Sequence, residues 1–133
     1  MKQAFVLIYC CLLALTACEK ADSTGKNYPE NLIGKWNYSQ SFYSIGGPLI
    51  YTNTERLHQW IEFKADGSFS SNMPAFQDVA GYEVLDSVKV KFIRPASASS
   101  ERFFVHFEPA TKTLTVSSAD HICIEGCGSK FKR

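Results

Sequence analysis

From residue 34 onward, apolar and polar residues alternate in short runs that glycine, proline and other turn residues interrupt. Such alternation places every second side chain on one face, as in a half-buried β-strand. The pattern predicts about eight strands at the spacing of an antiparallel barrel or sandwich. They cover residues 34–45, 57–64, 68–71, 81–85, 88–94, 102–108 and 113–117. The last pair is formed by residues 121–123 and 129–132.

The same alternation predicts which side chains point inward. In the first strand, Trp36, Tyr38 and Phe42 share a face opposite Asn37, Ser39 and Ser41. Asp66-Gly67 between two runs is a strong hairpin signal. In the later strands the predicted inward residues are Val88, Val90, Phe92, Phe103, Val105, Phe107, Leu114 and Val116.

The N-terminus carries a different pattern. Lys2 precedes an apolar run over residues 4–15, which is shorter than the roughly 20 residues of a membrane-spanning helix and is typical of a signal peptide. The run ends in Leu15-Thr16-Ala17-Cys18, which resembles the lipobox of bacterial lipoproteins. An ordinary secretory signal is the alternative, but Leu15 is a poor residue at the upper position of the A-x-A cleavage pattern. An uncleaved anchor is a third reading, disfavoured by the charged Glu19 and Lys20 that follow at once.

The lipobox implies that residues 1–17 are removed and that Cys18 is acylated, so that membrane lipid is the first expected partner. Residues 18–31 are polar and lack apolar periodicity, which predicts a flexible linker before a domain at 32–133. The resemblance implies a location in the cell envelope, anchored to the outer membrane. Whether the domain faces the periplasm or the outside stays open.

Charge and motifs narrow the function classes. The chain has 14 basic and 13 acidic residues, and removal of Lys2 leaves the mature chain neutral without a basic block. Nucleic acid is therefore not an expected partner. The sequence contains no nucleophile elbow, no H-E-x-x-H and no glycine-rich phosphate loop. It predicts neither an enzyme nor a cofactor.

Two cysteines, Cys123 and Cys127, lie in the predicted domain. The residues between them end in Gly126, which suits a short hairpin that places the two sulfur atoms near bonding distance. In an oxidising envelope this predicts a disulfide. The rival interpretation is zinc held by His121, Cys123 and Cys127, which lacks an obvious fourth ligand.

Several segments in order resemble lipocalins and lipocalin-like envelope proteins. The first is the G-x-W of Gly34 and Trp36, and the others are residues 61–69, 82–88, 123–127 and 131–133. The resemblance implies a small eight-stranded antiparallel up-and-down β-barrel. It also implies that Trp36 packs at the closed end under an arginine near the C-terminus, for which Arg133 is the candidate. The chain is shorter than typical lipocalins and lacks their helix beside the barrel.

The resemblance further implies binding or transport of a small apolar ligand. Tyr38, Tyr43 and Tyr51 cluster near the first loop and could be polar groups at a barrel mouth, and Trp60 could line a binding surface. We expect residues 43–54 to form the ligand entrance. An eight-stranded barrel can also be filled by its own side chains. The alternative is therefore a filled barrel that serves as a protein-interaction or assembly subunit of the envelope, with an envelope protein as its partner.

Overall fold

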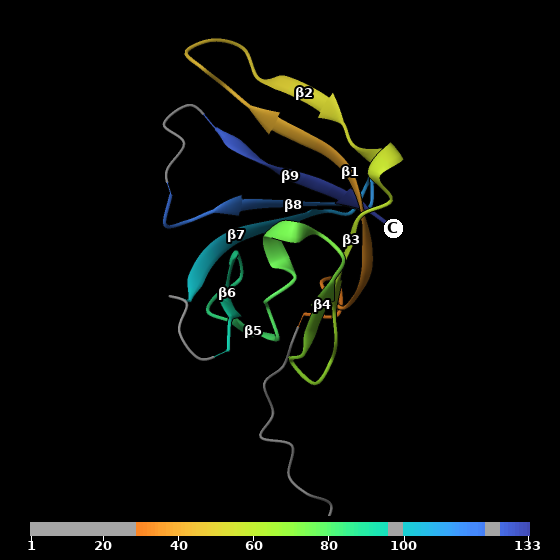
Figure 1. Cartoon of the computed structure of the whole chain (residues 1–133), viewed down its shortest axis with the longest axis vertical. Helices are drawn as coiled ribbons and strands as arrows, with labels where there is room; N and C mark the ends of the chain where they lie inside the picture. The colour runs from red at the N-terminus through yellow and green to blue at the C-terminus, as the bar shows by residue number, and fades with distance from the viewer. Residues whose placement is uncertain (1–28, 96–99, 122–125) are drawn as a thin grey trace, which may run out of the picture.

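The computed structural model describes residues 29–95, 100–121 and 126–133. Strands dominate this part of the chain (Figure 1). Two 3-10 helices interrupt them, η2 (Glu55–Leu57) and η3 (Pro74–Phe76). The strands are β1 (Gly34–Tyr43), β2 (Ile50–Asn53), β3 (Trp60–Phe63), β4 (Phe69–Ser71), β5 (Gly81–Val84), β6 (Lys89–Ile93), β7 (Glu101–Glu108), β8 (Thr113–Ser118) and β9 (Cys127–Lys132).

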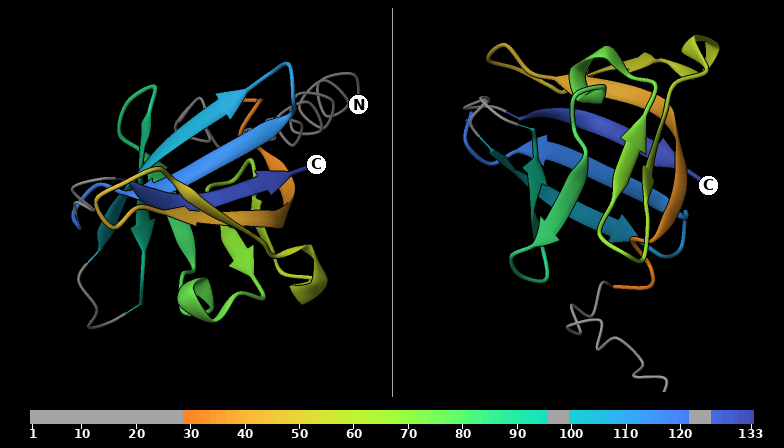
Figure 2. Two further views of the ribbon diagram at one scale, coloured as in Figure 1. Left: turned by 90° about the horizontal axis from the view of Figure 1, so that it is seen from above. Right: turned by 60° about the horizontal axis from the view of Figure 1, so that its bottom comes forward.

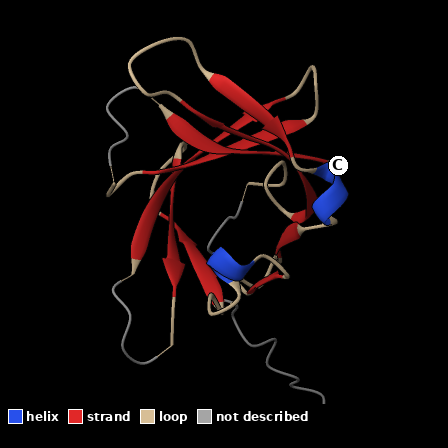
Figure 3. Ribbon diagram, turned by 45° about the horizontal axis from the view of Figure 1, so that its top comes forward, coloured by secondary structure: helices blue, strands red, loops and turns tan. Residues whose placement is uncertain are grey.

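The strands form one antiparallel sheet in the order β4-β3-β1-β9-β8-β7-β6-β5, and β2 pairs with β1 outside this path. The two ends of the path meet, because the Phe69 amide donates to the Ala80 carbonyl at 3.1 Å and the Tyr82 amide to the Gly67 carbonyl at 2.9 Å. Figures 2 and 3 show the strands curving around a common interior. The predicted all-β architecture is confirmed as a nearly closed barrel.

The predicted inward faces agree with the burial of most strands. Along β7 the side chains alternate strictly between half-buried and exposed, and Leu114 and Val116 of β8 are buried. Val90 and Phe92 of β6 are also buried, whereas Val88 is 44% exposed because it precedes β6 in the turn from β5. Val88 nevertheless lies on the same face as Val90 and Val105, with which it lines an apolar pocket, so the predicted inward face holds there too.

An aromatic cluster fills much of the barrel interior. Phe92 lies at its centre, with ring centroids 4.7 Å from Phe69, 4.9 Å from Phe103 and 5.3 Å from Phe76. Phe63 joins the cluster at 6.1 Å from Phe92. Because these rings come from β3, β4, η3, β6 and β7, their packing holds opposite sides of the wall together.

The first strand follows the predicted alternation only as far as a bulge near its middle. The register between β1 and β9 shifts between Tyr38 and Gln40, which is a β-bulge. Ser39 is 2% exposed, donates its hydroxyl proton to the Lys130 carbonyl at 3.0 Å and lines a polar hollow together with Gln40 and Lys130, on the face opposite the core. Beyond the bulge the alternation is reversed: Phe42 lies on the face of Lys130, whose Nζ is 5.9 Å from the Phe42 ring centroid. The prediction that Phe42 shares the face of Trp36 and Tyr38 was therefore wrong, because simple alternation holds only without an extra residue.

Two predicted segments also differ. Residues 50–53, expected within a loop, form β2 and pair with β1 from Gln40↔Asn53 to Tyr43↔Ile50. The expected strand at 121–123 is not present at His121, which lies in a bend, and residues 122 and 123 lie outside the described residues. The final pairing is instead that of β9 with β8 and β1.

Two glycines explain local geometry. Gly67, predicted in the Asp66-Gly67 turn, has φ +85° and joins β3 to β4. The Asp66 carboxylate accepts hydrogen bonds from the Ser68 hydroxyl and amide, and these bonds lower the pKa of Asp66. At Gly128 a Cβ atom would lie 2.7 Å from Phe42 Cζ and 2.8 Å from the Val116 carbonyl, so only glycine lets β8, β9 and the Phe42 ring approach so closely.

Candidate functional site

The end of the barrel where β1 begins and β9 ends, which we call the base, is organised around Trp36. This side chain is fully buried, and its indole N–H donates to the Leu32 carbonyl at 2.8 Å. Its ring meets Phe107 edge-on, with centroids 5.8 Å apart. Trp36 therefore fixes the N-terminal segment, through Leu32, against the end of β7.

Arg133 covers the outer side of Trp36. Its guanidinium carbon lies 4.3 Å from the indole centroid, which is a cation–π contact. The same guanidinium donates to the carbonyls of Asn31, at 3.2 Å, and Ile33. A Cβ at Gly34, which has φ +122°, would lie 3.4 Å from Arg133 Nη2. The structure thus brings together Gly34, Trp36 and Arg133, the three residues that the lipocalin resemblance assigns to the closed end.

An apolar pocket of about 330 Å³ opens at the base, between the N-terminal segment and the ends of β5 to β8. Leu32 covers one side. Aliphatic and aromatic side chains of the barrel wall cover the others: Val84, Val88, Val90, Val105, Phe107 and Leu114. Most of these wall residues are the predicted inward residues of three strands. At the base they line the pocket because no aromatic ring of the central cluster reaches this end.

Polar groups gather at the mouth of this pocket, from Asn31, the β5–β6 turn and His106. In the turn, the Asp86 carboxylate accepts the Val88 amide at 2.8 Å and lies 3.8 Å from Lys89 Nζ. Asp86 and Lys89 thereby keep their charged groups near solvent, whereas Val88 lines the pocket. The site has an apolar body and a polar edge, the arrangement common to small-molecule sites.

The size of the pocket limits what it can hold. A water-sized group occupies about 30 Å³ in a liquid. The pocket therefore has room for roughly ten such groups, enough for a short alkyl chain or a single ring system. Its titratable lining residues, Asp86 and His106, belong to the polar mouth, whereas the inner wall is aliphatic and aromatic.

The four residues predicted to bind ligand lie elsewhere and do not form one site. Tyr38 packs on Phe131, with centroids 5.3 Å apart. Trp60 is half-buried, with Lys35 Nζ 4.3 Å from the centroid of a Trp60 ring. Tyr43 and Tyr51 are exposed on the β1–β2 hairpin. None of the four lines the apolar pocket, and the expected entrance at 43–54 lies on this hairpin rather than at the base.

A second hollow, of about 550 Å³, lies on the outer face of β7, β8, β9 and β1. Polar side chains line it, among them Thr113, Thr115, Lys130 and Lys132. Water satisfies such hydroxyl and ammonium groups well, so this surface gains little from a small apolar ligand. We therefore take the smaller apolar pocket as the candidate site.

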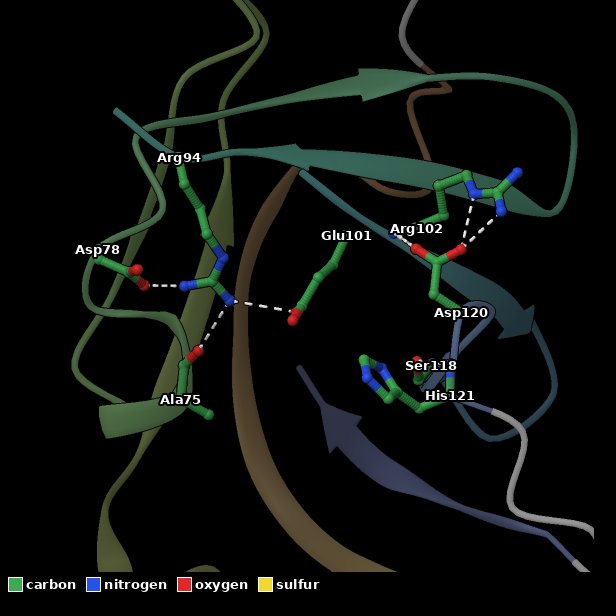
Figure 4. A network of polar contacts seen from close by, with 8 residues as sticks. All are labelled: Ala75, Asp78, Arg94, Glu101, Arg102, Ser118, Asp120 and His121. Carbon is green, nitrogen blue, oxygen red and sulfur yellow. Dashed lines mark hydrogen bonds and ion pairs between the residues drawn. The ribbon is translucent and has the colours of Figure 1, made fainter. Parts of the chain in front are cut away.

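Two arginines stabilise the loops away from the base (Figure 4). Arg94, whose side chain is 11% exposed, pairs with Asp78 and with Glu101, the latter at 3.3 Å, and so joins the η3 segment to β7. Arg102 donates through its side chain and amide to Asp120, and these hydrogen bonds lower the pKa of that carboxyl. Neither network lines the apolar pocket.

Other predicted residues lie partly outside the described structure. Cys127 is disulfide-bonded, and the other cysteines, Cys123 included, fall outside the described residues. The pairing of Cys127 with Cys123 stays a prediction, as does acylation of Cys18. Within residues 29–95, 100–121 and 126–133, no group of three or more His, Cys, Asp or Glu side chains could hold a metal ion. In the same residues no helix is long and apolar enough to cross a membrane.

In comparisons with known proteins, no family model, curated protein or solved structure matches this chain.

Proposed function

We propose that the chain is a lipid-anchored, lipocalin-like protein of the cell envelope that binds or carries a small apolar molecule in the pocket at its base. The observation that carries this proposal is the apolar pocket of about 330 Å³, which has a polar edge and an aliphatic and aromatic inner wall. Burial of apolar ligand surface contributes about 25 cal/mol per Å² before the losses of freedom on binding.

The position of the pocket supports the anchored form of this proposal. Pro29, near the end of the predicted linker 18–31, and Leu32, directly after it, both line the pocket. If Cys18 is acylated, the pocket opens beside the point where the linker joins the domain. A ligand that partitions into the outer membrane would then reach the pocket over a short path.

A second candidate function is a filled barrel that acts as an interaction or assembly subunit. The aromatic cluster around Phe92 favours it, because these rings occupy the interior that a typical carrier would leave open. The two candidates differ in one property: a carrier needs the base pocket to accept a ligand, and an interaction subunit does not.

A matched pair of substitutions tests the carrier. Val88→Phe adds a ring at the pocket, and Val88 is 44% exposed, so the ring can turn inward without overpacking the core. Ile93→Phe is the control, because Ile93 is equally exposed on β6 and does not line the pocket. We expect wild type and Ile93→Phe to bind 1-octanol alike in titration calorimetry of the full-length protein, and Val88→Phe to bind at least about tenfold more weakly.

Thermal unfolding of the three proteins shows whether each is folded. If folded Val88→Phe binds 1-octanol as tightly as wild type does, the ligand binds at another site. If wild type binds no 1-octanol up to its solubility limit, the carrier proposal is wrong and the interaction subunit takes its place.

A further inference from the structure

The β1–β2 hairpin extends from the barrel wall, and β2 is its outermost strand (Figure 1). Among the residues that the structure describes, β2 pairs with β1 and with no other strand. All four of its residues are exposed, and the side chains of Ile50 and Tyr51 are 41% and 49% exposed. An open strand edge presents unpaired backbone groups that can pair with another strand.

The register of the hairpin shows which backbone groups face outward. The Thr54 amide donates to the Ser39 carbonyl at 3.0 Å, so this pair belongs to the hydrogen-bonded set. Hydrogen-bonded and non-hydrogen-bonded pairs alternate along an antiparallel ladder. Thr52 and Ile50 therefore bond to β1, whereas the N–H and C=O groups of Tyr51 and Asn53 point away from it.

We propose that this edge pairs with the β2 strand of a second copy of the chain, antiparallel about a two-fold axis at Thr52. Tyr51 of each copy then lies opposite Asn53 of the other. In this register, the outward N–H and C=O groups of Tyr51 and Asn53 in each copy all form hydrogen bonds with the other copy. The resulting sheet runs continuously from β9 of one copy to β9 of the other.

Charge favours a second copy as the occupant. The residues from 44 to 54 (SIGGPLIYTNT) contain no charged side chain, in a chain in which 20% of residues are charged. Natural edge strands that avoid pairing commonly carry lysine or another charge. Residues 44–54 themselves therefore bring no like charges together on self-pairing, and the cation beside them, Lys130, lies over the Tyr51 ring at 4.9 Å. Self-pairing also places the two Tyr51 side chains on a diagonal of about 7–8 Å, within reach of aromatic rings.

The two-fold register makes a sharp prediction about cross-linking. At the axis the two Thr52 residues form a non-hydrogen-bonded pair, in which Cα atoms lie about 4.5 Å apart. This separation suits a disulfide. Thr52→Cys should therefore form a covalent dimer on mild oxidation of the full-length protein. Ile50→Cys is the control on the same strand and face, because its two copies would lie roughly 14 Å apart along the strands.

A second measurement avoids cysteine chemistry. Tyr51→Lys places like charges across the axis and removes the ring contact. Tyr43→Lys is the control, since Tyr43 is similarly exposed on the inner strand β1. In sedimentation analysis, Tyr51→Lys should raise the dimer dissociation constant at least about tenfold, and Tyr43→Lys should not.

Equal cross-linking at residues 50 and 52, or wild-type protein that stays monomeric at every concentration, would overturn this proposal. It does not depend on the base pocket, so either proposal can fail alone. A monomer whose β2 edge captures an unrelated peptide would also overturn it, in favour of a different occupant.

Discussion

Trp36→Ala is expected to lower the free energy of unfolding by about 3–5 kcal/mol, the range for large aromatic residues removed from a core. Trp36 is fully buried and makes three contacts that no alanine can replace. It donates to the Leu32 carbonyl, meets the Phe107 ring edge-on and lies under the Arg133 guanidinium. Leu32 and Phe107 also line the base pocket, so the same substitution should weaken ligand binding.

Urea denaturation, followed by circular dichroism, measures this loss. Trp60→Ala is the matched control, because Trp60 is half-buried and its indole ring lies beneath the exposed Lys35. We expect the control to lose less than half as much stability as Trp36→Ala. Equal losses in the two variants would contradict the role assigned to Trp36 at the base.

Phe92→Ala is the second substitution with a large expected effect, again about 3–5 kcal/mol. The Phe92 side chain is fully buried and contacts four other phenylalanine rings, from β3, β4, η3 and β7. Its removal leaves a cavity at the point where the two sides of the barrel meet. The loss should appear as a lower urea midpoint with an unchanged m-value, since the folded barrel is retained.

Phe104→Ala provides the comparison for Phe92. Phe104 lies on β7 next to Phe103 but points outward and is 42% exposed. Its removal should change the free energy of unfolding by less than about 1 kcal/mol. If Phe92→Ala were as mild as Phe104→Ala, the barrel interior would not be held by the aromatic cluster.

The inward faces of the later strands were predictable from sequence because each depends only on strand alternation. Leu114 and Val116 are buried as expected, and Asp66-Gly67 makes the expected turn. The bulge at Ser39 was not predictable, because its extra residue is defined only by the register of β1 against β9. β2 was missed because glycines and Pro48 precede a run too short to show alternation.

The candidate site was less predictable than the fold. Val90, Val105 and Leu114 were expected inside, but nothing in their spacing distinguishes a filled end from an open one. Whether this end is filled or open depends on Leu32 and the β5–β6 turn, which come together at the base only in the closed barrel. Aromatic residues near the first loop drew attention to Tyr43 and Tyr51 instead, and these lie on the exposed hairpin.

Native mass spectrometry of the protein, extracted gently from its own membrane, tests the proposed carrier most directly. The account predicts a chain that begins at an acylated Cys18 and holds a small molecule of reproducible mass, which Val88→Phe loses and Ile93→Phe keeps. An unmodified Cys18, or an anchored chain that carries no small molecule in any preparation, would contradict it.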